Sequence, residues 1–278
     1  MPPFAELSSV NIDGAQLAYR RAGSGPTVLL VHGIPTSSRL WDAVGAELAA
    51  GFDVIAPDML GYGESSKPLD RDVSISAQAE LLFGLLEALG VGPATVVGHD
   101  IGGGVAQIMA VHEPGRLAAL GLINAVCFDS WPIPAMLALK RSAPLAGRLP
   151  EGWVTGALAQ GISREVPEGQ AREAMRDGLA AWDRDPDSLR AFFRNVEALD
   201  SRHTQAIASE LGGIAVPTHV VWGAADRFQK PEYATRLRDA IPGATLRMID
   251  AGHFVPWARP AEVTAEVREL AGRAAQAA

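Results

Sequence analysis

Short apolar segments alternate along the chain with longer segments of helical periodicity. Six runs rich in Val, Ile, Leu and Ala are bounded by Gly or Pro, as buried strands are, and they span residues 27–31, 53–56, 94–97, 117–125, 218–222 and 244–249. Between them, apolar residues at spacings of three and four predict helices over residues 39–50, 75–89, 102–112, 231–240 and 260–275. This alternation predicts an α/β fold with a mostly parallel, twisted sheet flanked by helices on both faces.

Two regions depart from this alternation. Residues 10–22, with Asp13-Gly14 at their centre, predict an antiparallel hairpin joined to the sheet. Residues 128–213 show no strand pattern, and a Pro-rich stretch leads there into charged amphipathic helical segments. Ligands bind at the carboxyl ends of the strands in open α/β sheets, so we expect this insertion to form a helical cap over that edge. We therefore predict a core of residues 1–127 and 214–278 and a cap segment of residues 128–213.

The composition excludes several classes of protein. The 278 residues include 24 Lys and Arg against 32 Asp and Glu, a formal charge of -8 that argues against nucleic-acid binding. Hydrophobic residues make up 48% of the chain, enough for a large core, and the single cysteine, Cys127, suits a cytoplasmic protein better than a secreted one. No stretch approaches the roughly 18 apolar residues of a membrane helix, and the first residues lack the apolar run of a signal peptide. We expect no membrane association and a monomer or homodimer.

A candidate nucleophile follows the apolar run at residues 94–97. Residues 98–102, Gly-His-Asp-Ile-Gly, stand between that strand and a helix that begins with small residues. Glycines in this context allow the sharp turn of a nucleophile elbow, which holds one strained residue at the mouth of the ligand crevice. Asp100 occupies the strained position, and the helix behind it provides free N–H groups and a positive dipole end that favour a carboxylate. A glycine-rich helix start with a capping Asp is the simpler alternative.

Two further residues complete a catalytic pattern. Asp226 follows the strand at residues 218–222, and His253 follows the strand at residues 244–249. The order Asp100, Asp226, His253 is the chain order of an α/β-hydrolase triad. Ile34 follows the strand at residues 27–31, so its N–H group and that of Ile101 can form an oxyanion hole.

The sequence resembles the α/β-hydrolase superfamily over nearly its whole length, and within it the branch of haloalkane dehalogenases, haloacetate dehalogenases and epoxide hydrolases. The resemblance is carried by His-Gly-Ile-Pro-Thr-Ser-Ser at residues 32–38, by Ala-Pro-Asp-Met-Leu-Gly-Tyr-Gly-Glu-Ser at residues 56–65 and by Gly-His-Asp at residues 98–100. In that branch the acid follows the sixth or the seventh strand. Asn124 stands after the sixth strand here, so the acid role falls to Asp226.

An aspartate nucleophile indicates an alkyl electrophile. A serine that attacks a saturated carbon leaves a stable ether, whereas a carboxylate leaves an ester that water can cleave. We expect Asp100 to form an alkyl-aspartyl ester and His253, oriented by Asp226, to activate the water that hydrolyses it. The reaction needs no cofactor, and the six histidines show no spacing typical of a metal site.

The sequence offers several candidate residues that could stabilise the leaving group. Related dehalogenases place Asn after His-Gly and Trp after the nucleophile, but Ile34 and Ile101 occupy these positions. The indole N–H groups of Trp131, Trp153 and Trp182 in the cap segment are candidates, with packing as the alternative role. Haloacetate dehalogenases use Arg after the nucleophile, so the uncharged Ile101 disfavours that substrate class.

Epoxide opening is the second candidate reaction. Epoxide hydrolases use cap tyrosines as acids, but no Tyr lies between residues 128 and 213, which leaves His203 as a candidate donor or as a solvated helix-end residue. Ile34, Ile101, Val105, Phe128 and Trp131 predict a dry pocket for a small apolar organic substrate. Two other functions remain open: a lyase or isomerase that uses Asp100 as a general base, and a ligand-binding protein on a hydrolase scaffold.

Overall fold

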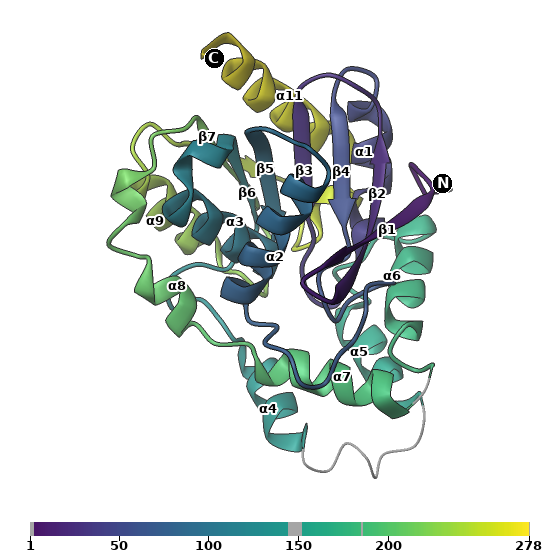
Figure 1. Ribbon diagram of the computed structural model, residues 1–278. Coiled ribbons are helices and arrows are strands. Elements are labelled where there is room, and N and C mark those ends of the chain that lie inside the picture. The colour runs from purple at the N-terminus through teal and green to yellow at the C-terminus, as the bar shows by residue number, and fades with distance from the viewer. Residues whose placement is uncertain (1–2, 144–151, 185, 278) are drawn as a thin grey trace.

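The computed structural model describes residues 3–143, 152–184 and 186–277. Its strands form an eight-stranded sheet in the order β1-β2-β4-β3-β5-β6-β7-β8 (Figure 1). The strands are β1 (Leu7–Ile12), β2 (Ala15–Ala22), β3 (Thr27–Val31), β4 (Asp53–Pro57), β5 (Ala94–His99), β6 (Leu117–Ile123), β7 (Thr218–Gly223) and β8 (Thr245–Ile249). Pairing is parallel from β4 to β8 and antiparallel for β1 and β2. The predicted mostly parallel sheet is confirmed.

Helices cover both faces of the sheet, as the alternating pattern predicts. They are α1 (Asp42–Leu48), α2 (Ile75–Ala88), α3 (Ile101–His112), α4 (Pro134–Ser142), α5 (Trp153–Ile162), α6 (Gln170–Ala180), α7 (Pro186–Glu197), α8 (Arg202–Ala206), α9 (Pro231–Ala240), α10 (Val255–Ala258) and α11 (Pro260–Ala277). Helices α2 and α3 pack together on one face, and α1 packs with α11 on the other (Figure 1). The central strands β3, β5 and β6 are therefore almost wholly buried, which explains their continuous apolar runs.

The predicted hairpin is formed by β1 and β2. Asp13 and Gly14 connect the strands with φ of 50° and 80°. Positive φ at both central residues matches the twist of the flanking strands, which is why Asp-Gly suits this turn. The hairpin joins the sheet through antiparallel pairing of β2 with β4.

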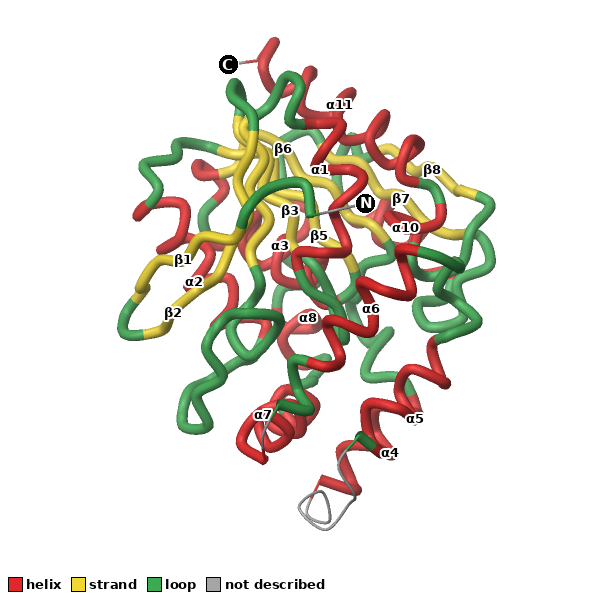
Figure 2. Tube along the Cα trace, turned by 90° about the vertical axis from the view of Figure 1, so that its right-hand side faces the viewer, coloured by secondary structure: helices red, strands yellow, loops and turns green. Residues whose placement is uncertain are grey.

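Helices α4 to α8 lie between β6 and β7 in the chain. No strand interrupts them in the described part of the cap segment. Figures 1 and 2 show α4, α5 and α7 beyond the carboxyl ends of the parallel strands, where the ligand crevice of this kind of sheet lies. Helix α4 buries none of its side chains fully. Across the described ranges, every helix is too short or too polar to cross a lipid bilayer.

Candidate active site

Asp100 occupies a sharp turn between β5 and α3. Its φ of 52° and ψ of -123° lie in a region of backbone conformation that residues other than glycine rarely adopt. Its main-chain oxygen accepts hydrogen bonds from the N–H groups of Gly103 at 2.9 Å and Val126 at 3.0 Å, which hold the turn. The strained backbone thus presents the carboxylate of Asp100 at the carboxyl edge of the sheet, as expected for a nucleophile elbow.

The glycines around Asp100 are required by space. A Cβ atom on Gly98 would lie 2.2 Å from the carbonyl oxygen of Gly102, and a Cβ atom on Gly102 would lie 2.3 Å from that of His32. A Cβ atom on Gly33 would lie 2.4 Å from Cβ of Asp100 itself. Close approach of three backbone segments therefore explains why the sequence places glycines on both sides of the elbow.

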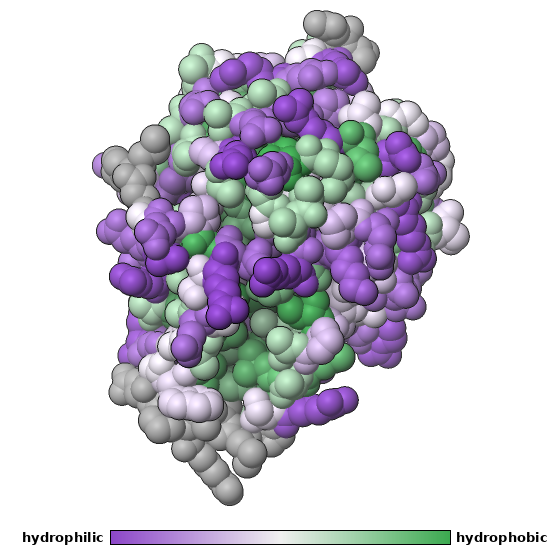
Figure 3. Space-filling view, turned by 180° about the vertical axis from the view of Figure 1, so that it is seen from behind, coloured by the Kyte–Doolittle hydropathy of each residue, from purple (hydrophilic) through white to green (hydrophobic). Residues whose placement is uncertain are grey.

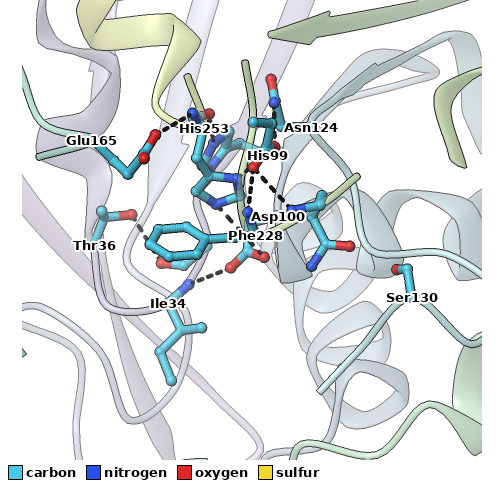
Figure 4. Close-up of polar contacts among 12 residues, drawn as sticks. Ile34, Thr36, His99, Asp100, Asn124, Ser130, Glu165, Phe228 and His253 are labelled. Carbon is cyan, nitrogen blue, oxygen red and sulfur yellow. Dashed lines mark hydrogen bonds and ion pairs between the residues drawn. The ribbon is translucent and has the colours of Figure 1, made fainter. Parts of the chain in front are cut away.

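The structure brings Asp100, His253 and Asp226 together (Figure 4). Nδ1 of His253 lies 2.9 Å from Oδ2 of Asp226, and its Nε2 lies 3.9 Å from Oδ1 of Asp100. Donation from Nδ1 to Asp226 requires the proton on Nδ1, which leaves the lone pair of Nε2 facing Asp100. The imidazole can therefore accept a proton from a molecule that enters between the two side chains.

Asp226 is fixed by three other hydrogen bonds. Its Oδ1 accepts the main-chain N–H groups of Phe228 at 2.7 Å and Gln229 at 2.9 Å, and its Oδ2 accepts Nδ2 of Asn124 at 2.5 Å. Asn124 thus occupies the position after β6 where some related enzymes carry the acid, and here it donates to Asp226, which follows β7. The sequence indicated only that Asn124 could not ionise.

Two main-chain N–H groups point at the carboxylate of Asp100. The N–H group of Ile34 donates to Oδ2 at 3.1 Å, and that of Ile101 also donates to the carboxylate. Oδ2 of Asp100 is therefore held by the N–H group of Ile34, while Oδ1 faces His253. This is the arrangement that an attacking carboxylate needs, because negative charge returns to the held oxygen when water attacks the ester.

Burial controls the charges of these groups. Burial in the cavity raises the pKa of Asp100 to about 6, against the opposing effects of His253 and the two N–H groups. Burial would lower the pKa of His253, but the carboxylates of Asp226, Asp100 and Glu165 outweigh it and raise that pKa above its ordinary value. Burial would likewise raise the pKa of Asp226, yet His253 and the hydrogen bonds to its carboxylate lower it. Asp226 is therefore the carboxylate that stays charged.

Two residues outside the predicted set support the histidine loop. Nε2 of His99 lies 3.0 Å from the main-chain oxygen of His253, and burial lowers the pKa of His99 to about 3, so its ring is neutral. Glu165, in the cap segment between α5 and α6, accepts the main-chain N–H of His253 at 3.4 Å (Figure 4). The same carboxylate lies 3.6 Å from Arg227, which follows the acid. A side chain of the cap segment thus contacts both the loop of Asp226 and the loop of His253.

A cavity of about 590 Å³ opens onto Asp100 and His253. Its walls are mainly apolar side chains of α4 and α5 together with Ile34, Ile101 and Phe228. In the space-filling view, apolar side chains gather in the lower part of the molecule, where Figure 1 places α4 and α5 (Figure 3). An apolar cavity that ends at two charged residues suits an uncharged organic molecule with one reactive atom.

Two of the residues proposed to bind substrate, Trp131 and Trp153, line this cavity. The N–H group of Trp131 donates to Oγ1 of Thr204 at 2.8 Å, so the ring contributes an apolar surface and not a donor. Trp153 is 60% exposed. The expectation that Trp131 offers an indole donor to a leaving group is therefore not met by its position.

The other four predicted substrate-binding residues do not line the cavity. Trp182 packs on Tyr62 and donates to the carbonyl oxygen of Gly61 at 3.1 Å. Nδ1 of His203 lies 2.8 Å from Oγ of Ser76. The remaining two are Phe128, whose ring lies 3.9 Å from the guanidinium of Arg236, and Val105, which is fully buried in α3. These side chains instead make contacts between elements or within the core.

The described residues contain no group of three or more His, Cys, Asp or Glu placed to hold a metal ion. A polar residue that the sequence analysis missed is Gln229, which lines the cavity three positions after Asp226. Its place in a loop after a strand that carries the acid is the signal that could have found it.

Comparison with known proteins identifies the family. Residues 26–260 match the family model described as the alpha/beta hydrolase fold, so the chain belongs to the α/β-hydrolase family. It is 28% identical to Lipase 1 of Psychrobacter immobilis over 94% of this chain and 82% of that protein. It is 27% identical to cis-3-alkyl-4-alkyloxetan-2-one decarboxylase of Shewanella oneidensis, over 87% of this chain and 81% of that protein.

Solved structures agree with this assignment. An alpha/beta hydrolase fold protein from Burkholderia ambifaria superimposes with a TM-score of 0.87 at 27% identity, covering 94% of this chain and 96% of that chain. The protein is thus an α/β-fold hydrolase. The names of its relatives state different reactions, so its particular chemistry must be argued from its own site.

Proposed function

We propose that the protein is a cofactor-free hydrolase that uses Asp100 as a nucleophile on apolar alkyl electrophiles. The observation that carries the proposal is the position of the Asp100 carboxylate. Oδ2 lies 3.1 Å from the N–H of Ile34, and Oδ1 faces Nε2 of His253 at 3.9 Å. A carboxylate that acts only as a helix cap has no need of a histidine opposite its second oxygen.

The reaction has two steps. Oδ1 of Asp100 attacks a saturated carbon, the bond to the leaving group breaks with its electron pair, and an alkyl-aspartyl ester forms. His253 then takes a proton from water, the oxygen of that water bonds to the carboxyl carbon of Asp100, and the alcohol leaves as the carboxylate is restored. The N–H groups of Ile34 and Ile101 stabilise the oxyanion of the second step, at roughly 3 kcal/mol for a well-placed donor.

The test follows the new oxygen atom. In a single turnover with bromohexane in water enriched in heavy oxygen, the first hexanol must carry light oxygen, because that atom comes from Asp100. A His253→Gln variant must accumulate a hexyl ester on Asp100, seen by mass spectrometry of the intact protein and its peptides. Direct transfer of solvent oxygen in the first turnover would instead support Asp100 as a general base.

Among leaving groups, a halide is our first candidate and the ring oxygen of an epoxide the second. No tyrosine lines the cavity in the described chain, so the usual acid of epoxide hydrolysis has no counterpart there. Epoxide opening therefore requires a donor other than tyrosine. Halide release and diol formation, measured separately on bromohexane and epoxyhexane, distinguish the two.

A specific relative favours one other electrophile. The Shewanella protein is named for a four-membered lactone, a cis-3-alkyl-4-alkyloxetan-2-one. If Asp100 attacks the saturated ring carbon that is bonded to the ring oxygen, the bond between these two atoms breaks. The leaving group is then a carboxylate, which needs no acid to protonate it. Loss of carbon dioxide from that carboxylate can then expel Asp100 and form an alkene. Detection of alkene and carbon dioxide, in place of a hydroxy acid, would assign this reaction to the protein.

A further inference from the structure

Gln229 lies in the loop between β7 and α9 with only 2% of its surface exposed. Its main-chain N–H donates to Oδ1 of Asp226 at 2.9 Å, and its main-chain oxygen accepts Nε1 of Trp222 at 2.9 Å. These contacts fix the loop that carries the acid, and they do not depend on the side chain. Gln229 also lines the same cavity as Asp100 and His253.

The amide of Gln229 has no protein partner. Within the described ranges of the chain, its Oε1 is buried without a hydrogen bond, and its Nε2 forms none. A buried amide without a partner costs about 1–3 kcal/mol, which an apolar side chain of the same length would avoid. A half turn about the last torsion of the side chain presents either the C=O or the N–H group to the cavity.

Two other uncharged polar side chains of the cavity wall, Ser142 and Trp131, already use their donors. The hydroxyl of Ser142 donates to the main-chain oxygen of Leu139 at 2.7 Å. The indole N–H of Trp131 donates to Thr204. Trp153 also lines this wall, but it is 60% exposed. Of the uncharged side-chain donors that the structure describes here, the amide of the buried Gln229 is therefore the one held inside the protein and left for a bound molecule.

We propose that the amide of Gln229 is the donor that stabilises the leaving atom, a role that rests on the proposed attack by Asp100. As Oδ1 of Asp100 bonds to carbon, the leaving atom departs with the electron pair of its bond, and an N–H of Gln229 donates to it. The substrate is therefore an apolar molecule with one hydrogen-bond-accepting leaving atom. A halide and an epoxide oxygen share this chemistry, and Gln229 replaces the donors absent at Ile34 and Ile101.

The test measures the first step alone. In a His253→Gln background, the rate of ester formation on Asp100 is compared with and without Gln229→Met, using chlorohexane, bromohexane, iodohexane and epoxyhexane. We expect Q229M to slow ester formation about 10- to 100-fold for chloride, as loss of a hydrogen bond to an anion does, and least for iodide, the weakest acceptor. The loss for epoxyhexane should be the largest, because its leaving oxygen carries the most localised charge. The melting temperature should stay level or rise.

Gln78→Met is the matched control. Gln78 is 1% exposed, but its Oε1 accepts the N–H of Leu60 at 3.0 Å and its Nε2 donates to the carbonyl oxygen of Leu60 at 2.9 Å. This substitution should therefore lower the melting temperature and leave the ratio of chloride to iodide rates unchanged. Opposite stability effects of one substitution at two buried glutamines would support the proposal.

The outcomes separate the two proposals. Ester formation at equal rates with and without Q229M overturns the role of Gln229 and leaves Asp100 as the nucleophile. An equal loss for all four substrates, with a lower melting temperature, overturns it also, because that result describes a structural residue. If no ester forms on Asp100 while Gln229 is intact, the proposed function itself fails.

Discussion

The conformation and the burial of Asp100 are both unfavourable for the stability of the fold. It is 5% exposed, its backbone has positive φ, and burial raises its pKa from 3.8 to about 6. A group whose pKa is higher in the folded state favours folding below its unfolded pKa, and it loses that contribution as pH rises through its folded pKa. Above pH 6, ionised Asp100 thus destabilises the folded chain, a cost typical of functional residues.

Asp100→Asn should therefore stabilise the protein while it abolishes turnover. We expect the free energy of unfolding at pH 8 to rise by about 1–3 kcal/mol, because the buried charge is removed. The gain should vanish near pH 4, where Asp100 in the original chain is protonated as well. Thermal unfolding of both proteins across this range checks the prediction, and a variant no more stable at pH 8 would contradict it.

The pH dependence of ester formation reports on the same group. In the proposed mechanism only ionised Asp100 attacks. Because His253 lowers the pKa of Asp100, the rate in His253→Gln should be half-maximal at pH 6 or slightly above. In the unmodified protein, overall turnover should begin to decline at a higher pH than this as the pH is lowered. The reason is that hydrolysis also needs neutral His253, whose pKa is raised above 6.5. Rapid-quench measurements of ester formation at several pH values test this. A rate that stays constant down to pH 4 would be inconsistent with it.

At the scale of elements, the elbow depends on contact between backbones. The Cβ atom of Gly102→Ala would meet the carbonyl oxygens of His32 and Val31 at 2.3 and 2.5 Å, and main-chain atoms cannot move aside as a flexible side chain can. We expect this variant to lose about 2–4 kcal/mol of stability and to turn over poorly. Urea unfolding measures the first effect.

Gly272→Ala makes the same change where space is free. Gly272 lies in α11 with no atom within 4 Å of a built Cβ, so this variant should gain up to about 1 kcal/mol from helix propensity. Equal effects of the two substitutions would show that crowding at the elbow is unimportant.

Whether the sequence predicts the position of a site residue depends on the element that carries it. Asp100, Asp226 and His253 could be placed because each follows a strand, and parallel strands bring their carboxyl ends to one edge whatever the side chains around them. Trp182 and His203 could not be placed, because the face that a cap helix presents depends on how it packs. The N–H of Trp182 meets Gly61, a residue 121 positions away. Gln229 escaped notice because an amide in a loop has no pattern of its own.

For the whole molecule, the size and polarity of the cavity set the range of substrates. Burying a methylene group contributes about 0.8 kcal/mol, so kcat/KM for bromoalkanes should rise about fourfold per added carbon until the cavity is full. Leu158→Trp adds bulk in the wall and should end this rise at a shorter chain.

Leu137→Trp is the control, since Leu137 is 38% exposed and does not line the cavity. A chain-length series for the two variants and the original protein provides the measurement. The same cut-off for L158W and the original chain would place the alkyl group elsewhere.

The contact of Glu165 with the N–H of His253 links two parts of the molecule that could otherwise diverge separately. In evolution, recombination between family members can exchange the insertion after β6 and so alter what enters the cavity. An incoming insertion without a carboxylate at position 165 would leave that N–H unpaired and the imidazole less firmly held. Among recombinants that retain activity, most should therefore carry an acidic residue at position 165. Substrate specificity, set by the insertion, is then inherited together with the residues that hold His253.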